Sequence, residues 1–306
     1  PAGGQTAFSS GSAIASILVA DNPQPPQLAA ESYSIQADDS LIINAPGLLA
    51  NDFDPDAPSP PAAVAGAKLV YDASADVDGD NRWEDATGVA GFDWVLPGGV
   101  SRIVNPASIR PGIQASYNFS GVGGLTDSLA SLPGDPSNNA ASFELWFKPV
   151  IDSDHDVLFE TGGSADGTSI SLDGNTLKFV IRDTNVSVAE LELSAVINPT
   201  DFTQVVGVID PGLGAMRLYV NGSLVASGID SGLNDWDGGD GAGLGAVHSA
   251  VNASGLANYE GEIALFRFYE SALSSTQVEA NFDSVAEGLK VVSVGLQAGS
   301  GGTLTV

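Results

Sequence analysis

The chain has 306 residues, of which 43% are hydrophobic and only 16% charged, with 37 glycines, 17 prolines and no cysteine. This composition suits many short strands joined by tight turns, not a helical bundle, and it excludes disulfides and thiolate metal sites. The 38 acidic and 10 basic residues give a formal net charge of -28, which argues against a nucleic acid partner because its phosphate backbone would be repelled.

The N-terminal 61 residues contain three predicted strands separated by proline-rich stretches. Residues 12–20 form the first, with nothing upstream to pair with, and residues 32–36 and 41–44 form the other two. The longest early apolar run, residues 14–20, is too short for membrane insertion, and no signal peptide is evident. Because the chain begins with proline, we expect a fragment or a processed product.

The central part of the chain alternates apolar and other residues with the period of a β-strand. Residues 142–148, 177–182 and 216–220 each place one set of apolar side chains on one face. Two-residue hairpin turns are predicted at Asp173-Gly174 and Asn221-Gly222. These patterns predict an antiparallel two-sheet sandwich.

One short helix is expected near the end of this domain. Ser274 and Gln277 have the spacing of a capping box, and Val278 and Phe282 lie one helical turn apart. A single helix is compatible with an otherwise all-β fold.

The N-terminal segment resembles the opening of bacterial cadherin-like tandem repeats. The resemblance rests on Ser32-Tyr33-Ser34, on Asp38-Asp39, and on Pro46-Gly47-Leu48-Leu49-Ala50-Asn51-Asp52 followed by Asp54 and Asp56. The strand that follows in such repeats appears here only at residues 289–306, as LKVVSVGLQAGSGGTLTV. We therefore expect a large domain, residues 62–288, inserted into a smaller, split cadherin/Ig-like β-sandwich made of residues 23–61 and 289–306.

Residues 1–22 then remain as a terminal strand and linker belonging to a preceding or partner module. Two explanations stay open for this strand. Either the repeat is cut short, or the strand of one copy completes the unfinished sandwich of the next copy.

The central domain resembles the laminin-G-like members of the concanavalin A-like lectin/glucanase superfamily. The resemblance is carried by the order of seven segments: SFELWFKP (142–149), DVLFETGG (156–163), ISLDGNTLKFVI (170–181), FTQVVGVID (202–210), MRLYVNGSLVAS (216–227), DWDGGDGAGLG (235–245) and GEIALFRFYESALSSTQVEANF (261–282). It implies an antiparallel jelly-roll β-sandwich, frequent Ca²⁺ binding, and recognition of glycans or proteins through loops at one rim.

The first candidate calcium site is an acidic, glycine-containing loop. Alternating carboxylates can converge on one cation there, and hard oxygen ligands suit Ca²⁺. The spacing is not that of an EF-hand, and a solvated acidic loop is the alternative. Its candidate ligands are Asp76, Asp78, Asp80, Asn81, Glu84 and Asp85. The neighbouring Trp83 is expected to pack into the core.

The second candidate site combines acidic residues with a tryptophan in a glycine-rich segment. Asp235, Asp237 and Asp240 can hold an ion or accept hydrogen bonds from sugar hydroxyls. Trp236 can stack on a sugar ring, or it can seal the edge of the sandwich. Both explanations of the tryptophan remain open at this stage.

Two further acidic groups are weaker candidates. Asp152, Asp154 and Asp156 lie between two strands, where Asp154 and Asp156 are candidate ligand contacts. In the cadherin-like segment, Asp52, Asp54 and Asp56 are candidate calcium ligands that would rigidify the junction. The strong acidity of the chain is thus explained either by such sites or by a solubilising surface of the kind found in saline habitats.

Catalysis is not expected. Glycoside hydrolases of the resembled superfamily use a Glu-x-Asp-x-x-Glu run, and the nearest analogues, Glu144 and Glu190-Leu-Glu192, lack that spacing. His155 and His248 have no second histidine at ligand spacing, which argues against zinc.

The expected function is an extracellular calcium-binding adhesion or recognition module of a bacterial surface protein. Its partner would be a glycan or a surface protein. The alternative is a structural subunit of an extracellular filament or surface layer, assembled from copies of the chain by strand complementation.

Overall fold

The structure is a computed structural model. It describes residues 63–76, 79–89, 91–108, 110–121, 124–125, 132–133, 139–163, 165–183, 190–238, 241–248 and 255–286, with the backbone of four short strands at 15–19, 41–42, 291–296 and 304–305. The chain divides into two compact units. The smaller comprises residues 1–60, 108–111 and 286–306, and the larger comprises residues 61–107 and 112–285.

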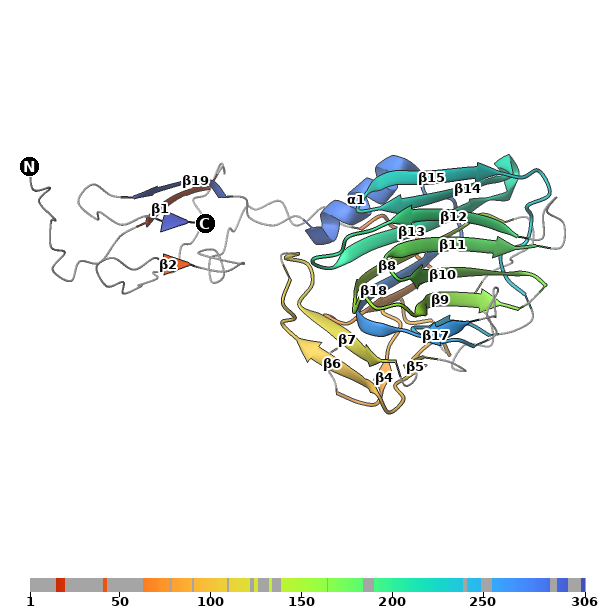
Figure 1. The fold of residues 1–306 in the computed structure, drawn as a ribbon, viewed down its shortest axis with the longest axis horizontal. Coiled ribbons are helices and arrows are strands. Elements are labelled where there is room, and N and C mark those ends of the chain that lie inside the picture. Colours follow the sequence, from red (N-terminus) through yellow and green to blue (C-terminus); the bar gives the residue numbers. More distant parts are fainter. Residues whose placement is uncertain are drawn as a thin grey trace, which may run out of the picture. The chain divides into compact units, whose positions relative to one another are not determined.

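In the smaller unit the structure describes two pairs of strands (Figure 1). Strand β1 (Ala15–Val19) pairs antiparallel with β19 (Val291–Leu296), and β2 (Leu41–Ile42) pairs parallel with β20 (Leu304–Thr305). The N-terminal strand therefore pairs with a strand near the opposite end of its own chain, an arrangement that neither of the two explanations above included. The cadherin-like assignment and the domain boundaries stay predictions, and the strand expected at residues 32–36 lies outside the described residues.

The larger unit is built on two sheets that are antiparallel except where β17 joins β9. The six-stranded sheet has the order β12-β11-β10-β9-β16, with β17 also beside β9. Its strands are β9 (His155–Gly162), β10 (Gly167–Asp173), β11 (Thr176–Arg182), β12 (Leu191–Val196), β16 (Gly243–Leu244) and β17 (Leu256–Asn258).

The eight-stranded sheet has the order β15-β14-β13-β8-β18-β7-β6, with β3 also beside β18. Its strands are β3 (Leu69–Asp72), β6 (Val100–Val104), β7 (Ala115–Ser120), β8 (Ala141–Pro149), β13 (Thr203–Asp210), β14 (Ala215–Val220), β15 (Ser223–Ile229) and β18 (Glu260–Tyr269). The hairpin of β4 (Arg82–Trp83) and β5 (Trp94–Val95), the 3-10 helix η2 (Pro211–Leu213) and the helix α1 (Ser275–Ala286) complete the unit.

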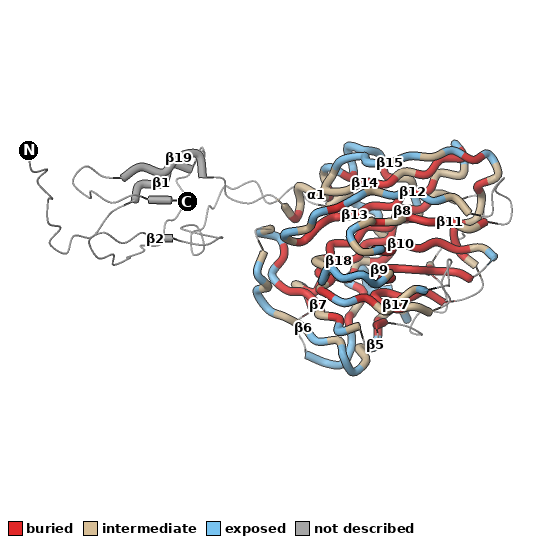
Figure 2. The backbone as a smooth tube through the Cα atoms, viewed as in Figure 1, coloured by how far each residue is buried: buried red, intermediate tan, exposed pale blue. Residues whose placement is uncertain are grey.

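The hydrophobic core lies between the two sheets, and the buried stretches follow their strands (Figure 2). On β8 the alternating residues Phe143, Leu145 and Phe147 enter this core. Phe143 packs against Phe159 of the other sheet, with ring centroids 5.2 Å apart. The predicted all-β sandwich is confirmed, because period-two alternation places every second side chain between the layers.

Both predicted hairpins are present in the larger unit. Gly174, in the turn between β10 and β11, has a φ of 58°. In the turn between β14 and β15, Asn221 and Gly222 have φ angles of 47° and 77°. Asparagine and glycine tolerate these left-handed conformations, which a tight hairpin turn requires.

The predicted helix is also present and begins with the expected cap. The Ser274 N–H donates to the Gln277 side chain at 2.9 Å, and the Gln277 N–H donates back to Ser274 Oγ at 3.3 Å. Val278 is fully buried, and the Phe282 ring stacks on Trp146 of β8 at a centroid distance of 5.6 Å. No helix in the described part of the chain is long and apolar enough to cross a bilayer.

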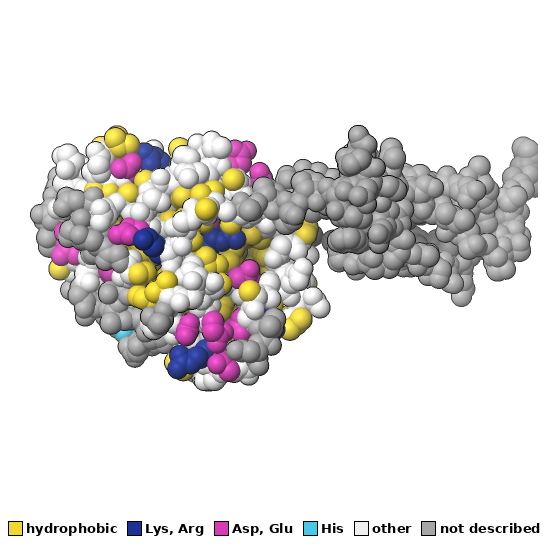
Figure 3. Space-filling view, turned by 180° about the vertical axis from the view of Figure 1, so that it is seen from behind, with side chains coloured by type: hydrophobic (Ala, Val, Ile, Leu, Met, Phe, Trp, Pro, Cys, Tyr) yellow, Lys and Arg dark blue, Asp and Glu magenta, His cyan; other side chains and the backbone are white. Residues whose placement is uncertain are grey.

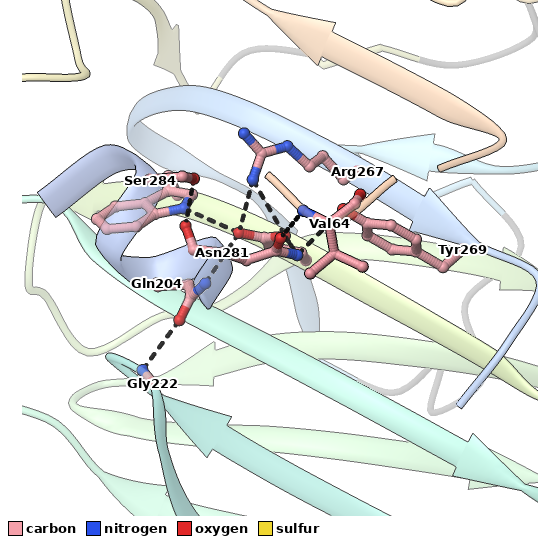
Figure 4. A network of polar contacts seen from close by, with 9 residues as sticks. Val64, Gln204, Gly222, Arg267, Tyr269, Asn281 and Ser284 are labelled. Carbon is pink, nitrogen blue, oxygen red and sulfur yellow. Dashed lines mark hydrogen bonds and ion pairs between the residues drawn. The ribbon is translucent and has the colours of Figure 1, made fainter. Parts of the chain in front are cut away.

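A network of polar contacts joins the helix to the eight-stranded sheet, and Figure 4 labels its members Gln204, Arg267 and Asn281. Glu144 has no exposed surface. It accepts hydrogen bonds from Trp146 Nε1 (3.1 Å), Gln204 Nε2 (2.9 Å), Asn281 Nδ2 (2.7 Å) and Arg267 Nη1 (3.3 Å). Four donors, one of them a charged guanidinium, offset the cost of removing this carboxylate from water.

Candidate metal centre

Two aspartates meet at the open end of the β10–β11 hairpin. Gly167 at the start of β10 is opposite Arg182 at the end of β11. The next residues outward are Asp166 and Asp183, which therefore flank the same end of the hairpin. Neither was among the predicted site residues, although the hairpin register, counted from the turn at Asp173-Gly174, places them opposite each other.

The loop after β15 brings a third aspartate to this position. Asp183 is only 2% exposed, and its Oδ2 accepts hydrogen bonds from the backbone N–H groups of Asn234 (2.7 Å) and Asp235 (2.9 Å). One residue further, the Trp236 carbonyl accepts a hydrogen bond from Thr168 Oγ1 at 2.6 Å. These bonds fix the loop against the hairpin.

Close backbone packing at the same place demands glycine. A Cβ atom on Gly238 would lie 2.4 Å from the carbonyl oxygen of Asp166, and one on Gly162 would lie 2.5 Å from it. No real side chain tolerates such distances. Glycine at positions 162 and 238 therefore allows the loop to approach the hairpin closely.

The result is a compact group of three carboxylates. Asp166, Asp183 and Asp235 each offer an oxygen, and these oxygens lie within 4.8 Å of one another. Oδ1 of Asp235 is buried and has no hydrogen-bond partner in the described part of the chain. Three acidic groups at this separation repel one another, and a divalent cation between them would relieve that repulsion.

The chemistry of this donor set fits calcium. Ca²⁺ takes six to eight hard oxygen ligands at about 2.3–2.6 Å, so the ligands of one ion lie within about 5 Å of one another. Zinc is a poor fit, because neither histidine belongs to the group. Asp235 was predicted as a calcium ligand, but with Asp237 and Asp240, not with Asp166 and Asp183.

The predicted partners of Asp235 are placed differently. Asp237 is 4% exposed, and its Oδ1 accepts hydrogen bonds from Thr161 Oγ1 (2.7 Å) and the Gly238 N–H (2.9 Å). Burial raises the pKa of Asp237, and these two hydrogen bonds oppose that rise. Asp240 lies outside the described residues.

The prediction that Trp236 stacks on a sugar is wrong. Its side chain has no exposed surface. The ring packs at 5.7 Å from Phe143 and 5.3 Å from Phe268, both within the sandwich core. The alternative explanation, a tryptophan that seals the sandwich, is the one that the structure supports.

The described carboxylates of the acidic loop at residues 76–85 do not form a group of three. Among the described residues, no three of its side chains bring ligand atoms within 4.8 Å of one another. Asp76 is 8% exposed and accepts a hydrogen bond from the Tyr117 hydroxyl. Asp80 and Asn81 are exposed, Glu84 is half-buried, and Asp78 lies outside the described residues.

Asp85 at the end of that loop binds backbone groups of β3 and of the segment that follows the loop. Its carboxylate accepts hydrogen bonds from the N–H groups of Val70 (2.8 Å), Thr87 (3.2 Å) and Val89 (3.1 Å), and from the Thr87 hydroxyl. The expected core position of Trp83 is confirmed, since it has no exposed surface. The predicted ligands Asp52, Asp54 and Asp56 lie outside the described residues.

Asp154 and Asp156 differ sharply in burial. Asp154 is exposed, whereas Asp156 on β9 is 3% exposed. Burial raises the pKa of Asp156 to about 6, and the charges of Asp152, Asp154 and Glu260 raise it too, while a hydrogen bond from the Glu260 N–H opposes the rise. The raised pKa means that the folded protein disfavours the charged form.

Replacing Asp156 with Asn should stabilise the protein at neutral pH. The stability contribution of Asp156 is fully present below its ordinary pKa of 3.8 and is lost as the pH rises through about 6. We expect D156N to exceed the parent by about 1–2 kcal/mol at neutral pH and to match it in acid, measured by urea unfolding in EDTA. D154N, at an exposed position, should change little. If Ca²⁺ stabilises the parent protein but not D156N, Asp156 is instead a metal ligand.

Acidic side chains appear at several separate places on the surface of the larger unit (Figure 3). Exposed carboxylates are therefore not confined to the candidate centre. What distinguishes Asp166, Asp183 and Asp235 is their convergence from separate segments of the chain.

Three solved structures illustrate the similarity to known folds. Ruminococcus gnavus IT-sialidase CBM40 bound to alpha2,3 sialyllactose is 15% identical, with 54% of this chain and 95% of that chain covered and a TM-score of 0.43. Domain 4 of AbnA, a GH43 extracellular arabinanase from Geobacillus stearothermophilus, in complex with arabinotriose is 21% identical, with coverages of 70% and 97% and a TM-score of 0.46. The binding domain of botulinum neurotoxin DC in complex with SialylT is 13% identical, with coverages of 72% and 52% and a TM-score of 0.48. Each is a partial structural similarity at low identity.

The sequence itself carries a family match. No curated protein matches the chain. The family model Laminin_G_3, described as the concanavalin A-like lectin/glucanases superfamily, matches residues 123–279, slightly more than half of the chain. These residues include the β10–β11 hairpin and the loop that carries Asp235. The chain belongs to the concanavalin A-like lectin/glucanases superfamily.

Proposed function

We propose that the larger unit is a calcium-dependent glycan-binding module. The observation that carries this proposal is the convergence of Asp166, Asp183 and Asp235 at one end of the β10–β11 hairpin. Three carboxylates provide only part of the six to eight oxygens that Ca²⁺ takes. The remaining positions suit water or the hydroxyl groups of a sugar, and membership of a lectin superfamily supports a carbohydrate as the ligand.

Calcium should bind the isolated protein and stabilise it. A ligand that binds only the folded state adds about 2.7 kcal/mol at a hundredfold excess over its Kd, so the melting temperature should rise with Ca²⁺ and fall again with EDTA. In D235N, which keeps the size of the side chain but removes a charge, this shift should be lost. Calorimetric titration with CaCl₂ measures the affinity directly.

The matched control for this experiment is D154N, which also removes one aspartate charge but at an exposed position. It should keep the calcium affinity of the parent protein. Equal Ca²⁺ affinity in the parent and in D235N would rule out the proposed centre. Loss of calcium affinity in both D235N and D154N would indicate that the acidic surface in general binds the ion.

Glycan recognition is tested separately. We expect the parent protein to bind a subset of a glycan array in CaCl₂ and to lose that binding in EDTA, while D235N binds weakly in both. If the protein binds Ca²⁺ but no glycan on the array, the proposed calcium site stands and the proposed glycan ligand is wrong.

In this proposal the module binds a glycan and does not hydrolyse it. The nearest analogues of a catalytic carboxylate run are engaged in the structure: Glu144 is buried under the helix, and Glu190 pairs with Arg182 at 3.0 Å. Release of reducing sugars from a panel of polysaccharides would contradict this part. A position outside the cell, on the surface of a bacterium, belongs to the same proposal and is compatible with a domain free of cysteine.

A further inference from the structure

The turn between β14 and β15 contains a chemically labile dipeptide. Asn221-Gly222 is the only Asn-Gly pair in the chain. Asparagine is a thermolabile residue, and a following glycine has no side chain to hinder attack of its backbone nitrogen on the asparagine carboxamide. Both residues are partly exposed, so water reaches them. The turn therefore brings together the reactants of a deamidation.

This reaction takes two steps and needs only water as a co-reactant. The backbone nitrogen of Gly222 loses its proton to base in the solvent and attacks Cγ of Asn221. The bond from Cγ to Nδ2 breaks, and Nδ2 takes a proton from water and leaves as ammonia. Water then opens the resulting cyclic imide at one of its two carbonyl groups. The product is aspartate, or isoaspartate, in which the main chain runs through the side-chain carbon.

One residue of β13, Gln204, holds both reacting groups. The Gly222 N–H, which carries the attacking nitrogen, donates to Gln204 Oε1 at 3.0 Å (Figure 4). Oδ1 of Asn221, on the carbon under attack, accepts a hydrogen bond from the Gln204 backbone N–H at 3.0 Å. A third hydrogen bond runs from the Asn221 N–H to the Gln204 carbonyl, also at 3.0 Å.

Gln204 is itself fixed in place. Its side chain has no exposed surface, and its Nε2 donates to Glu144 at 2.9 Å. Because the amide group is bonded at both ends, its oxygen stays directed at Gly222. The helix limits the turn from another side, since a Cβ atom on Gly222 would lie 3.3 Å from the Phe282 side chain of α1.

We propose that Asn221 is a deamidation site that Gln204 protects in the folded protein. The turn must open before the reaction, because the hydrogen bonds hold the proton on the Gly222 nitrogen and the carboxamide in its position. The rate is therefore set by local opening of the β14–β15 hairpin and not by unfolding of the whole domain. Calcium has no part in this reaction, so the inference is independent of the proposed function.

The modification would damage the hairpin. Isoaspartate adds a carbon atom to the main chain, whereas a two-residue turn joins its strands at one loop length only. Because Gly222 packs against Phe282, the contact between the turn and α1 should loosen as well. Protection of Asn221 therefore preserves the turn and its contact with the helix over the lifetime of the protein.

Peptide mapping by mass spectrometry tests the inference. The full chain is kept folded in a mildly alkaline buffer, and the same chain in urea is the unprotected reference. In urea, Asn221 should convert faster than the other asparagines. In the folded parent it should convert at least about tenfold more slowly than in urea. In folded Q204M, whose side chain has similar length but no amide acceptor, conversion should be about five to ten times faster than in the folded parent, as expected for the loss of one hydrogen bond.

The matched control is E144Q, which alters the same network but keeps an acceptor for Gln204 Nε2 and leaves Gln204 beside Gly222. It removes the charge opposite Arg267 and should lower overall stability, yet Asn221 should convert as in the parent. Circular dichroism establishes that both variants are folded. Equal acceleration in Q204M and E144Q overturns the proposal. So does a Q204M protein that converts as slowly as the parent, a folded parent that converts as fast as in urea, or an Asn221 that stays intact in urea.

Discussion

Replacing Glu144 with Ala is expected to lower the free energy of unfolding by about 3–5 kcal/mol, the usual cost of removing one partner from a buried ion pair. The variant leaves Arg267, only 8% exposed, without the carboxylate that lies 3.3 Å away. It also removes the acceptor shared by Gln204 and Asn281. Because Asn281 belongs to α1, the attachment of the helix should weaken together with the sheet.

The measurement is urea unfolding followed by circular dichroism. E190A is the matched control, because it also breaks an arginine–glutamate pair, but one in which both side chains are partly exposed. That variant should lose less than about 1 kcal/mol. Similar losses in E144A and E190A would contradict the importance assigned to the buried network.

A double variant separates two effects of E144A, the loss of the ion pair and the burial of an unpaired arginine. Replacing Glu144 and Arg267 together by methionine removes both charges and leaves no isolated guanidinium. The double variant should be more stable than E144A, since a buried ion pair often contributes little net stability compared with apolar residues of similar volume. A double variant less stable than E144A would show that Arg267 has further essential contacts.

Replacing Trp236 with Ala is expected to cost about 3–5 kcal/mol of unfolding free energy, as for other large aromatic residues removed from a core. The ring is fully buried and packs on Phe143 and Phe268. Removing it leaves a large cavity beneath the loop that carries Asp235. The calcium affinity should therefore fall together with the stability.

W236F is the informative control, because it retains an aromatic ring and should lose less than the alanine variant. Thermal unfolding and Ca²⁺ titration of both variants, compared with D235N, separate the two effects. D235N should lose calcium binding while keeping the stability of the metal-free protein. A W236A protein of parental stability that loses only glycan binding would restore the sugar-stacking hypothesis and contradict the core position.

The sequence by itself determined the class of fold and many of its local features. Alternation in β8, β11 and β14 was readable because every second side chain of a strand points to the same face. The turn at Asn221-Gly222 and the cap formed by Ser274 and Gln277 were readable because both depend on neighbouring residues only. The superfamily followed from the order of several such segments.

The structure groups the described carboxylates differently from the sequence prediction. Spacing along the chain favoured residues 76–85, and it joined Asp235 to Asp237 and Asp240. In the structure, Asp85 accepts a hydrogen bond from the Val70 N–H of β3, and Asp237 accepts one from Thr161. Spacing along the chain shows which residues can meet, but the packing of distant segments decides which carboxylates converge.

The candidate centre and the buried network were decided by tertiary structure. Asp166, Asp183 and Asp235 come together because one hairpin closes in register and a distant loop is hydrogen-bonded to its open end. Glu144 receives its donors from three other strands or helices far along the chain. Local sequence specifies strands, turns and caps, whereas convergence of distant side chains depends on how the two sheets and their loops pack against each other.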